Sequence, residues 1–233
     1  MYWGNHIAPL FFMMIDRKLI IFDLDGTIVD SLDDLTVSVN HMLGSFGHPL
    51  LRREGVRSLV GQGALKLVER AMPGAEPDVI RKALEIFLEY NARHLIDATA
   101  PYPDVDSTLR KLQCFGHTMV VVTNKNESLS RQLLAALGLD GFFREIYGAD
   151  TLPSRKPSPE PLLHVMGVLG FSKDKTLMVG DSINDISAGN AAGVVTIGCS
   201  WGYGNIDELE NADWRIDKFS DLLYLPPLDE NAK

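Results

Sequence analysis

The stretch that decides the fold is LIIFDLDGT, residues 19–27. Its first four residues form a continuous apolar run, which is typical of a strand buried on both faces of a parallel sheet. The run ends at two aspartates, Asp23 and Asp25, and these are followed by Gly26, which allows the backbone to bend sharply. The stretch therefore predicts a buried strand that delivers two carboxylates to one cavity.

Apolar runs of the same kind recur along the chain. They occupy residues 119–122, 176–179 and 194–197, with a shorter candidate at 145–147. Helical patterns lie between them, and two of these end at a glycine. Strands that alternate with helices predict an α/β fold with a Rossmann-like, doubly wound parallel sheet.

Residues 32–100 break this alternation. They contain no convincing strand, and residues 80–91 follow the spacing of an amphipathic helix. Because the stretch is far longer than an ordinary crossover, we expect a small helical domain inserted after the first strand. Residues 17–31 and 101–233 would then form the Rossmann-like core, and residues 1–16 an N-terminal leader outside it.

Composition narrows the classes of partner and location. The 233 residues include 31 acidic and 22 basic ones, which gives a formal net charge of −9. Nucleic acids and anionic membranes bind surfaces rich in Lys and Arg, so neither is expected as a partner. The two cysteines, Cys114 and Cys199, are too few for a disulfide framework. We expect reduced thiols in a cytoplasmic protein that is a monomer or a homodimer.

Polar side chains collect where the predicted strands end, which is where open α/β sheets bind ligands. The side chains concerned are Asp23, Asp25, Thr123, Asn124, Asp181 and Asp185, with Lys156 in a loop between the second and third groups. Crowded carboxylates repel one another unless a cation lies among them, and oxygen ligands alone favour Mg²⁺. A magnesium ion beside a lysine and a hydroxyl suits a phosphoryl group, because the three share its negative charge.

At these residues the chain resembles the haloacid dehalogenase superfamily of phosphohydrolases. The matching motifs occur in the family's order: Asp23-Leu24-Asp25-Gly26-Thr27, Thr123, Lys156-Pro157 and Gly180-Asp181-Ser182-Ile183-Asn184-Asp185. Four stretches are most similar to phosphoglycolate phosphatases: Val29-Asp30-Ser31, Leu59-Val60-Gly61-Gln62-Gly63-Ala64, Lys156-Pro157-Ser158-Pro159 and Ser200-Trp201-Gly202-Tyr203-Gly204. The inserted helical domain, residues 32–100, looks like the family's cap.

The resemblance implies a Mg²⁺-dependent phosphomonoesterase that works through an aspartyl phosphate and hydrolyses 2-phosphoglycolate to glycolate and phosphate. Asp23 would be the nucleophile, and Asp25 would act first as the acid and then as the base. The expected ligands of Mg²⁺ are the Asp23 and Asp181 carboxylates and the backbone carbonyl of Asp25. Asp185 would hold metal-bound water or orient Lys156.

The resemblance also implies how the substrate binds. Thr123, Asn124 and Lys156 would bind phosphoryl oxygens. The loop Gly61-Gln62-Gly63 is a candidate for contact with the rest of the substrate, since glycines allow close backbone approach, although a simple turn between helices explains it equally well.

Other functions share parts of this pattern. The substrate could instead be a sugar phosphate, another small organic phosphate or pyrophosphate, and a phosphomutase would use the same core. A phosphoacceptor signalling receiver also combines aspartates, a Thr or Ser and a Lys with Mg²⁺. A receiver is usually compact, however, and has no need for an acid two residues after its nucleophile. Catalytic release of phosphate separates it from a phosphatase.

Overall fold

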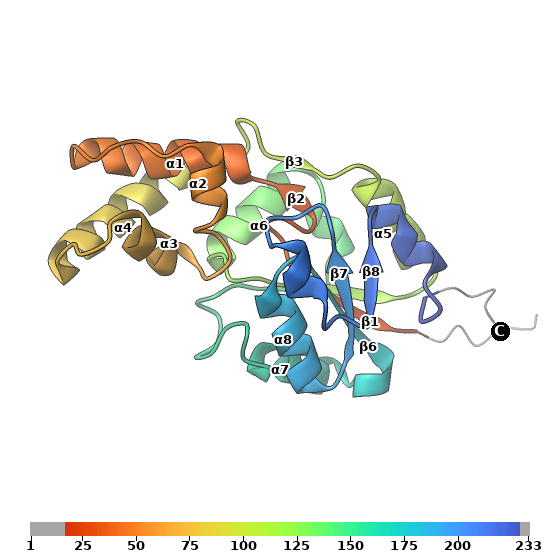
Figure 1. The fold of residues 1–233 in the computed structure, drawn as a ribbon. Helices are drawn as coiled ribbons and strands as arrows, with labels where there is room; N and C mark the ends of the chain where they lie inside the picture. The colour runs from red at the N-terminus through yellow and green to blue at the C-terminus, as the bar shows by residue number, and fades with distance from the viewer. Residues whose placement is uncertain (1–16, 229–233) are drawn as a thin grey trace, which may run out of the picture.

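The computed structural model describes residues 17–228, which fold around one parallel sheet (Figure 1). Within these residues the sheet has six strands in the order β5-β4-β1-β6-β7-β8, and all neighbouring pairs are parallel. The strands are β5 (Glu145–Tyr147), β4 (Thr118–Val122), β1 (Leu19–Phe22), β6 (Thr176–Gly180), β7 (Val195–Cys199) and β8 (Trp214–Ile216). The predicted α/β, Rossmann-like fold is confirmed.

Helices cover both faces of this sheet. Alternate residues of β1 enter two different hydrophobic clusters: Ile20 and Phe22 pack with residues of α5 and α6, whereas Leu19 and Ile21 pack with residues of α7 and α8. These helices are α5 (Val105–Cys114), α6 (Glu127–Ala136), α7 (Glu160–Leu169) and α8 (Ile183–Ala192). Short 3₁₀ segments are η1 (Asp140–Phe142), η2 (Lys173–Lys175), η3 (Ile206–Leu209) and η4 (Phe219–Tyr224). Burial on both faces explains why the strands are apolar without alternation.

Four more helices lie to one side of the sheet (Figure 1), and we call them the helical unit. They are α1 (Leu32–Ser45), α2 (Arg53–Arg57), α3 (Ala64–Ala71) and α4 (Pro77–Arg93). The unit has a hydrophobic cluster of its own, in which α1 and α4 supply most of the buried side chains. Two short antiparallel strands, β2 (Val29–Asp30) and β3 (Ala100–Pro101), connect it to the sheet. Its two connections therefore lie side by side.

The sequence patterns missed three short strands and misplaced the ends of three others, β4, β6 and β7, by one or two residues. β2 and β3 have two residues each, and in β8 both Trp214 and Arg215 are exposed, so none of the three shows an apolar run. The run predicted at 194–197 forms β7 from Val195, and pairing with β6 and β8 extends it to Cys199. The ends of these strands are set by hydrogen bonds with the neighbouring strands, so they cannot be found from apolar residues alone.

Three other expectations concern single features. The leader predicted at residues 1–16 lies outside the described residues. Cys114 is exposed and Cys199 is buried, and both are free thiols. Within residues 17–228, no helix has the length and apolar character needed to cross a membrane.

Close packing between α8 and the sheet gives a test of this core. A Cβ at Gly189 would lie 2.4 Å from Thr196 Cγ2, whereas a Cβ at Gly167 on α7 would meet nothing within 4 Å. We expect Gly189→Ala to lower the free energy of unfolding by about 1–3 kcal/mol through overpacking. Gly167→Ala should raise it by about 0.5–1 kcal/mol through helix propensity. Urea unfolding of both variants checks this, and equal effects of one sign would contradict the packing described.

Candidate active site

The order of the strands brings three distant segments together. β1 lies between β4 and β6, so the residues that follow these strands meet at one edge of the sheet. Asp23 follows β1 and its amide donates to Val179 O at 2.9 Å, while Thr123 follows β4 and Asp181 follows β6. The edge at which the sequence predicted a site is therefore built from neighbouring strands.

Lys156 lies among these side chains and is 2% exposed. Its Nζ is 2.8 Å from Asp23 Oδ1 and 2.7 Å from Asp185 Oδ1, and it donates to Val122 O at 2.6 Å. Burial alone would lower the pKa of Lys156, but the charges of Asp185 and Asp23 outweigh burial and raise it. Lys156 is thus a cation held between two carboxylates.

The first turn of α8 fixes Asp185, whose side chain is fully buried. Asp185 Oδ2 accepts hydrogen bonds from Ser182 N at 3.1 Å and from Ser182 Oγ at 2.8 Å. The first of these bonds, together with the contact of the Asp185 backbone N–H with the Ser182 side chain, forms a capping box. Its other oxygen faces Lys156. The helix cap therefore sets the position of the carboxylate that orients the lysine.

Asp181 completes an acidic triad with Asp23 and Asp185, whose oxygens lie within 4.8 Å of one another. Thr27 Oγ1 donates to Asp181 Oδ1 at 2.9 Å, and Tyr203 N donates to Asp181 Oδ2 at 2.7 Å. Burial raises the pKa of Asp181 to about 7, and the charges of Asp185 and Asp23 add to the rise. Burial also raises the pKa of Asp23 to about 6, although Lys156 opposes the rise. The ammonium of Lys156 contacts only two of the three carboxylates, so the triad could hold a metal ion as a further cation.

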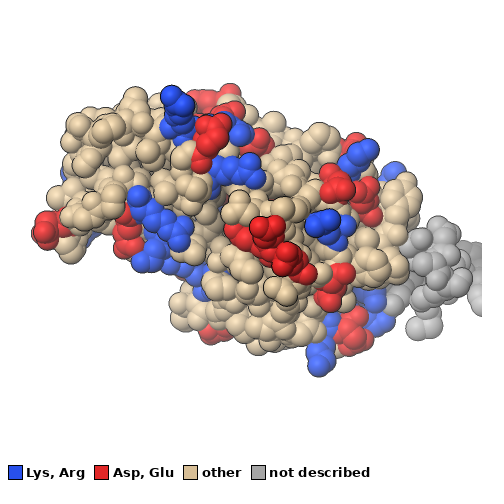
Figure 2. Space-filling view, in the orientation of Figure 1, with Lys and Arg blue, Asp and Glu red and all other residues tan. Residues whose placement is uncertain are grey.

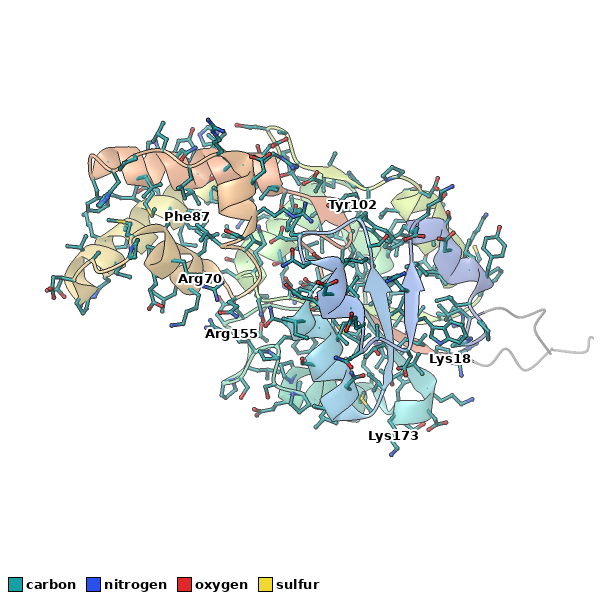
Figure 3. All side chains as sticks on the ribbon, in the orientation of Figure 1. Lys18, Arg70, Phe87, Tyr102, Arg155 and Lys173 are labelled. Atoms are coloured by element: carbon teal, nitrogen blue, oxygen red, sulfur yellow. The ribbon has the colours of Figure 1, made fainter. Side chains whose placement is uncertain are left out.

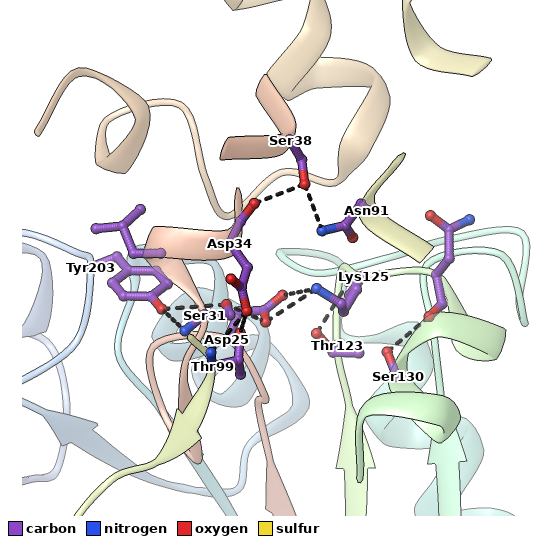
Figure 4. A network of polar contacts seen from close by, with 12 residues as sticks. Asp25, Ser31, Asp34, Ser38, Asn91, Thr99, Thr123, Lys125, Ser130 and Tyr203 are labelled. Carbon is purple, nitrogen blue, oxygen red and sulfur yellow. Dashed lines mark hydrogen bonds and ion pairs between the residues drawn. The ribbon is translucent and has the colours of Figure 1, made fainter. Parts of the chain in front are cut away.

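Asp25 has a different set of partners from the triad, and Figure 4 shows them. Ser31 Oγ donates to Asp25 Oδ1 at 2.6 Å. Lys125 Nζ lies 3.3 Å from Asp25 Oδ1 and 3.1 Å from Oδ2. The carboxylate of Asp25 is therefore held by one hydroxyl and one ammonium, separately from Asp23.

The loop Gly61-Gln62-Gly63 comes from the helical unit and lies against this edge. Asn124 Nδ2 donates to Gly61 O at 2.8 Å and to Lys156 O at 2.9 Å, and Asn184 Nδ2 donates to Gly61 O at 3.3 Å. Thr123 Oγ1 accepts a bond from Lys125 N at 3.3 Å. Two asparagines of the core thus bind the carbonyl of this loop.

Two hollows meet at Asp23 and Asp25, both of which line each of them. The larger, of about 550 Å³, also borders Asp181, Arg57 and Arg70. The smaller, of about 60 Å³, lies between the helical unit and the residues after β4. In Figure 2, basic side chains gather on the edge of the helical unit beside acidic ones on the core. Arg70 donates to Gln62 Oε1 and Arg155 lies beside Gly63, so both contact the loop Gly61-Gln62-Gly63; both are labelled in Figure 3.

Sequence reasoning assigned no role to three residues that the structure brings to the site: Lys125, Arg57 and Tyr203, of which Tyr203 lies in a stretch quoted above for the resemblance. Arg57 donates to Gly202 O at 2.8 Å and to Tyr203 O at 2.9 Å, which ties α2 to the loop that binds Asp181. Lys125 comes two residues after Thr123, and this position close to a strand end could have indicated it as a site residue. No local sequence pattern indicated Arg57, because the residues that it contacts lie about 145 positions away in the sequence.

The buried position of Lys156 yields a stability test. Lys156→Met would leave Asp23 and Asp185 without their shared cation, so at pH 8 we expect a loss of about 3–5 kcal/mol in the free energy of unfolding. Lys173→Met, which changes an exposed lysine, should shift it by less than about 0.5 kcal/mol. Urea unfolding measures both, and a similar small effect of the two substitutions would contradict the ion pairs described.

Comparison with known proteins places the chain in a family. The family described as haloacid dehalogenase-like hydrolase matches residues 20–199. The phosphoglycolate phosphatase of Neisseria gonorrhoeae is 41% identical over 222 residues, covering 93% of each chain. That of Haemophilus influenzae Rd is 41% identical over 218 residues, covering 89% of this chain and 97% of its own.

A solved structure has the same fold. A crystal structure of a predicted phosphoglycolate phosphatase from Haemophilus somnus 129PT superposes with a TM-score of 0.87 at 36% identity, covering 91% of this chain and 98% of that one. The family match spans more than half of the chain, and it includes all three residues of the acidic triad. The chain therefore belongs to the haloacid dehalogenase-like hydrolase family and is a phosphoric monoester hydrolase.

Proposed function

We propose that this enzyme hydrolyses 2-phosphoglycolate to glycolate and phosphate through an aspartyl phosphate on Asp23, with Mg²⁺ as its cofactor. One observation carries the proposal: Lys156 Nζ lies 2.8 Å from Asp23 Oδ1, in a site where Asp23 and Asp181 oxygens are within 4.8 Å. A nucleophilic carboxylate beside cations is what attack on a phosphoryl group requires. The relatives named as phosphoglycolate phosphatases support the substrate.

Asp23 would attack phosphorus with one carboxylate oxygen. The new O–P bond forms as the bond to the leaving oxygen breaks, and Asp25 gives its proton to that oxygen. Asp25, now a carboxylate, then takes a proton from the water that attacks the phosphoaspartate, which releases phosphate and restores Asp23. Lys156 would bind a phosphoryl oxygen and spread its charge, together with Thr123 and the Asn124 backbone.

The residues present fit Mg²⁺. The raised pKa values of Asp181 and Asp23 mean that the triad lacks positive charge when it is fully ionised. The available ligands are all oxygens: the Asp23 and Asp181 carboxylates, the Asp25 carbonyl, and Asp185 through a water molecule. A bound Mg²⁺ would supply charge neutralisation at the phosphoryl group.

The helical unit would act as a cap over this site, so we assign residues 32–100 to a cap and residues 17–31 and 101–233 to the core. The contacts of Arg57 with the Tyr203 loop and of Asn124 with Gly61 O support this assignment. A closed cap excludes bulk water while Asp23 is phosphorylated, and it must open to exchange substrate and product.

A panel of small phosphomonoesters tests the function. We expect kcat/KM for 2-phosphoglycolate to exceed that for glucose 6-phosphate and for pyrophosphate by at least about 100-fold, with many turnovers per enzyme. Asp23→Asn should lose at least about 10³-fold in kcat, because the amide is a poor nucleophile, and should retain its circular dichroism spectrum. A single turnover, or a sugar phosphate as the best substrate, would contradict the proposal.

The stabilisation of the enzyme by Mg²⁺ should depend on pH. In the unfolded chain the carboxyls of Asp23 and Asp181 have the ordinary pKa of 3.8, whereas in the metal-free native state these pKa values are about 6 and about 7. Between about pH 4 and pH 7 the native state therefore keeps protons that the unfolded chain has already released. Its stability therefore falls as pH rises through that range, while Mg²⁺, which needs the deprotonated forms, binds better.

The expected result is a larger Mg²⁺-induced rise in Tm at pH 8 than at pH 5.5. At 100 times its Kd, the ion should add about 2.7 kcal/mol to the free energy of unfolding. Asp181→Asn should abolish the rise, and Asp78→Asn on the exposed surface of α4 should keep it. Differential scanning calorimetry with and without Mg²⁺ measures this, and a rise independent of pH would argue against these ligands.

A further inference from the structure

Lys125 is a buried cation that the mechanism above does not use. It lies just after β4, its side chain is 8% exposed, and its Nζ is 3.1 Å from Asp25 Oδ2 (Figure 4). Among the described residues, its ammonium contacts no acceptor other than the Asp25 carboxylate. An ammonium has three donor hydrogens, so a further acceptor can bind to it.

The smaller pocket places this ammonium in apolar surroundings. Asp25 and Lys125 line it together with side chains of the helical unit, among them Leu35, Leu67 and Phe87. Lys125 is the one basic side chain among its lining residues. The volume of about 60 Å³ holds about four to six water-sized groups at ~10–15 Å³ each, which suits a carboxymethyl group.

The other cations near Asp23 are committed elsewhere. Lys156 contacts two carboxylates and a carbonyl and is assigned to the phosphoryl group in the proposed function, and Arg57 donates to the carbonyls of the Tyr203 loop. Arg70 lines the larger hollow and donates to Gln62 Oε1. A negative charge on the leaving group, close to Asp25, would therefore meet Lys125 first.

We propose that Lys125 binds the carboxylate of the leaving group and so selects phosphomonoesters of small hydroxy acids. This rests on the proposed function, in which Asp25 protonates the leaving oxygen. In 2-phosphoglycolate one carbon separates that oxygen from the carboxylate. A leaving oxygen that is hydrogen-bonded to Asp25 therefore lies next to the ammonium that contacts Asp25, and a carboxylate one carbon away can reach that ammonium.

This arrangement favours substrates whose leaving group carries a negative charge. A carboxylate among leucines and Phe87 would be costly without a cation, and Lys125 removes that cost. A neutral leaving group gains nothing comparable from the ammonium. Lys125 also contacts Asp25, so its loss affects the hydrolysis of all substrates through the acid. The ratio of kcat/KM for a substrate with a carboxylate to kcat/KM for a neutral one cancels this shared effect and reports the binding of the carboxylate.

The test compares 2-phosphoglycolate with 2-hydroxyethyl phosphate, which has a hydroxymethyl group in place of the carboxylate. We expect Lys125→Met to reduce the ratio of their kcat/KM values at least about 10-fold, mainly through the KM of phosphoglycolate. Lys125→Arg should keep the ratio within about 3-fold of the wild type. Lys82→Met, an exposed change on α4, should leave both substrates unchanged.

Two results would overturn the assignment. One is a Lys125→Met enzyme that is slower on both substrates by the same factor, because Lys125 would then act through Asp25 alone. The other is a loss of the preference in Arg70→Met with retention in Lys125→Met, which would put the carboxylate in the larger hollow. Should Lys125→Met not fold, Lys125→Gln gives the same comparison.

The proposed function fails in a different way. A wild-type enzyme with equal kcat/KM for the two esters would show, before any substitution, that the carboxylate is not selected, and both proposals would fall. A wild-type enzyme that prefers phosphoglycolate, together with a Lys125→Met enzyme that keeps the preference, overturns the assignment of Lys125 alone.

Discussion

The buried ion pairs of Lys156 are the constraint on which the site depends. An ammonium removed from water must find acceptors for its charge, and here Asp23, Asp185 and the Val122 carbonyl surround it at 2.6–2.8 Å. These acceptors come from the ends of β1 and β4 and from α8. Moving any one of these elements would leave a charge unpaired in the interior, so the ion pairs fix the elements that carry the chemistry.

The same ion pairs leave an excess of negative charge. Lys156 neutralises one carboxylate of the triad, and the raised pKa values of Asp23 and Asp181 express the remaining repulsion and burial. The chain packs tightly around this charge: a Cβ at Gly26 would lie 2.5 Å from Asp181 Oδ2, and φ there is +88°. Glycine is thus required twice over at this turn, for its conformation and for its size.

Much of this could be predicted from the sequence, because the relevant signals are local. An apolar run followed at once by Asp23 reports both a buried strand and a polar strand end, and parallel topology then brings such ends together. Burial cannot be predicted in this way. Lys125 looks like a solvated lysine until α3 and α4 pack over it, and Arg57 reaches Gly202 across a separation of 145 residues. Strands as short as β2 and β3 exist only through their pairing.

The Tyr203 loop shows why the helical unit and the chemistry are coupled. Tyr203 N donates to Asp181, its carbonyl accepts from Arg57 of α2, and its hydroxyl accepts from the amide of Ser31. Ser31 in turn donates to Asp25. A displacement of the helical unit would therefore break the bonds of Arg57 to the Tyr203 loop, and this loop also binds a candidate metal ligand and Ser31, the partner of the candidate acid. Because these bonds run through one residue, the Tyr203 loop links the position of α2 to the positions of Asp181 and Asp25.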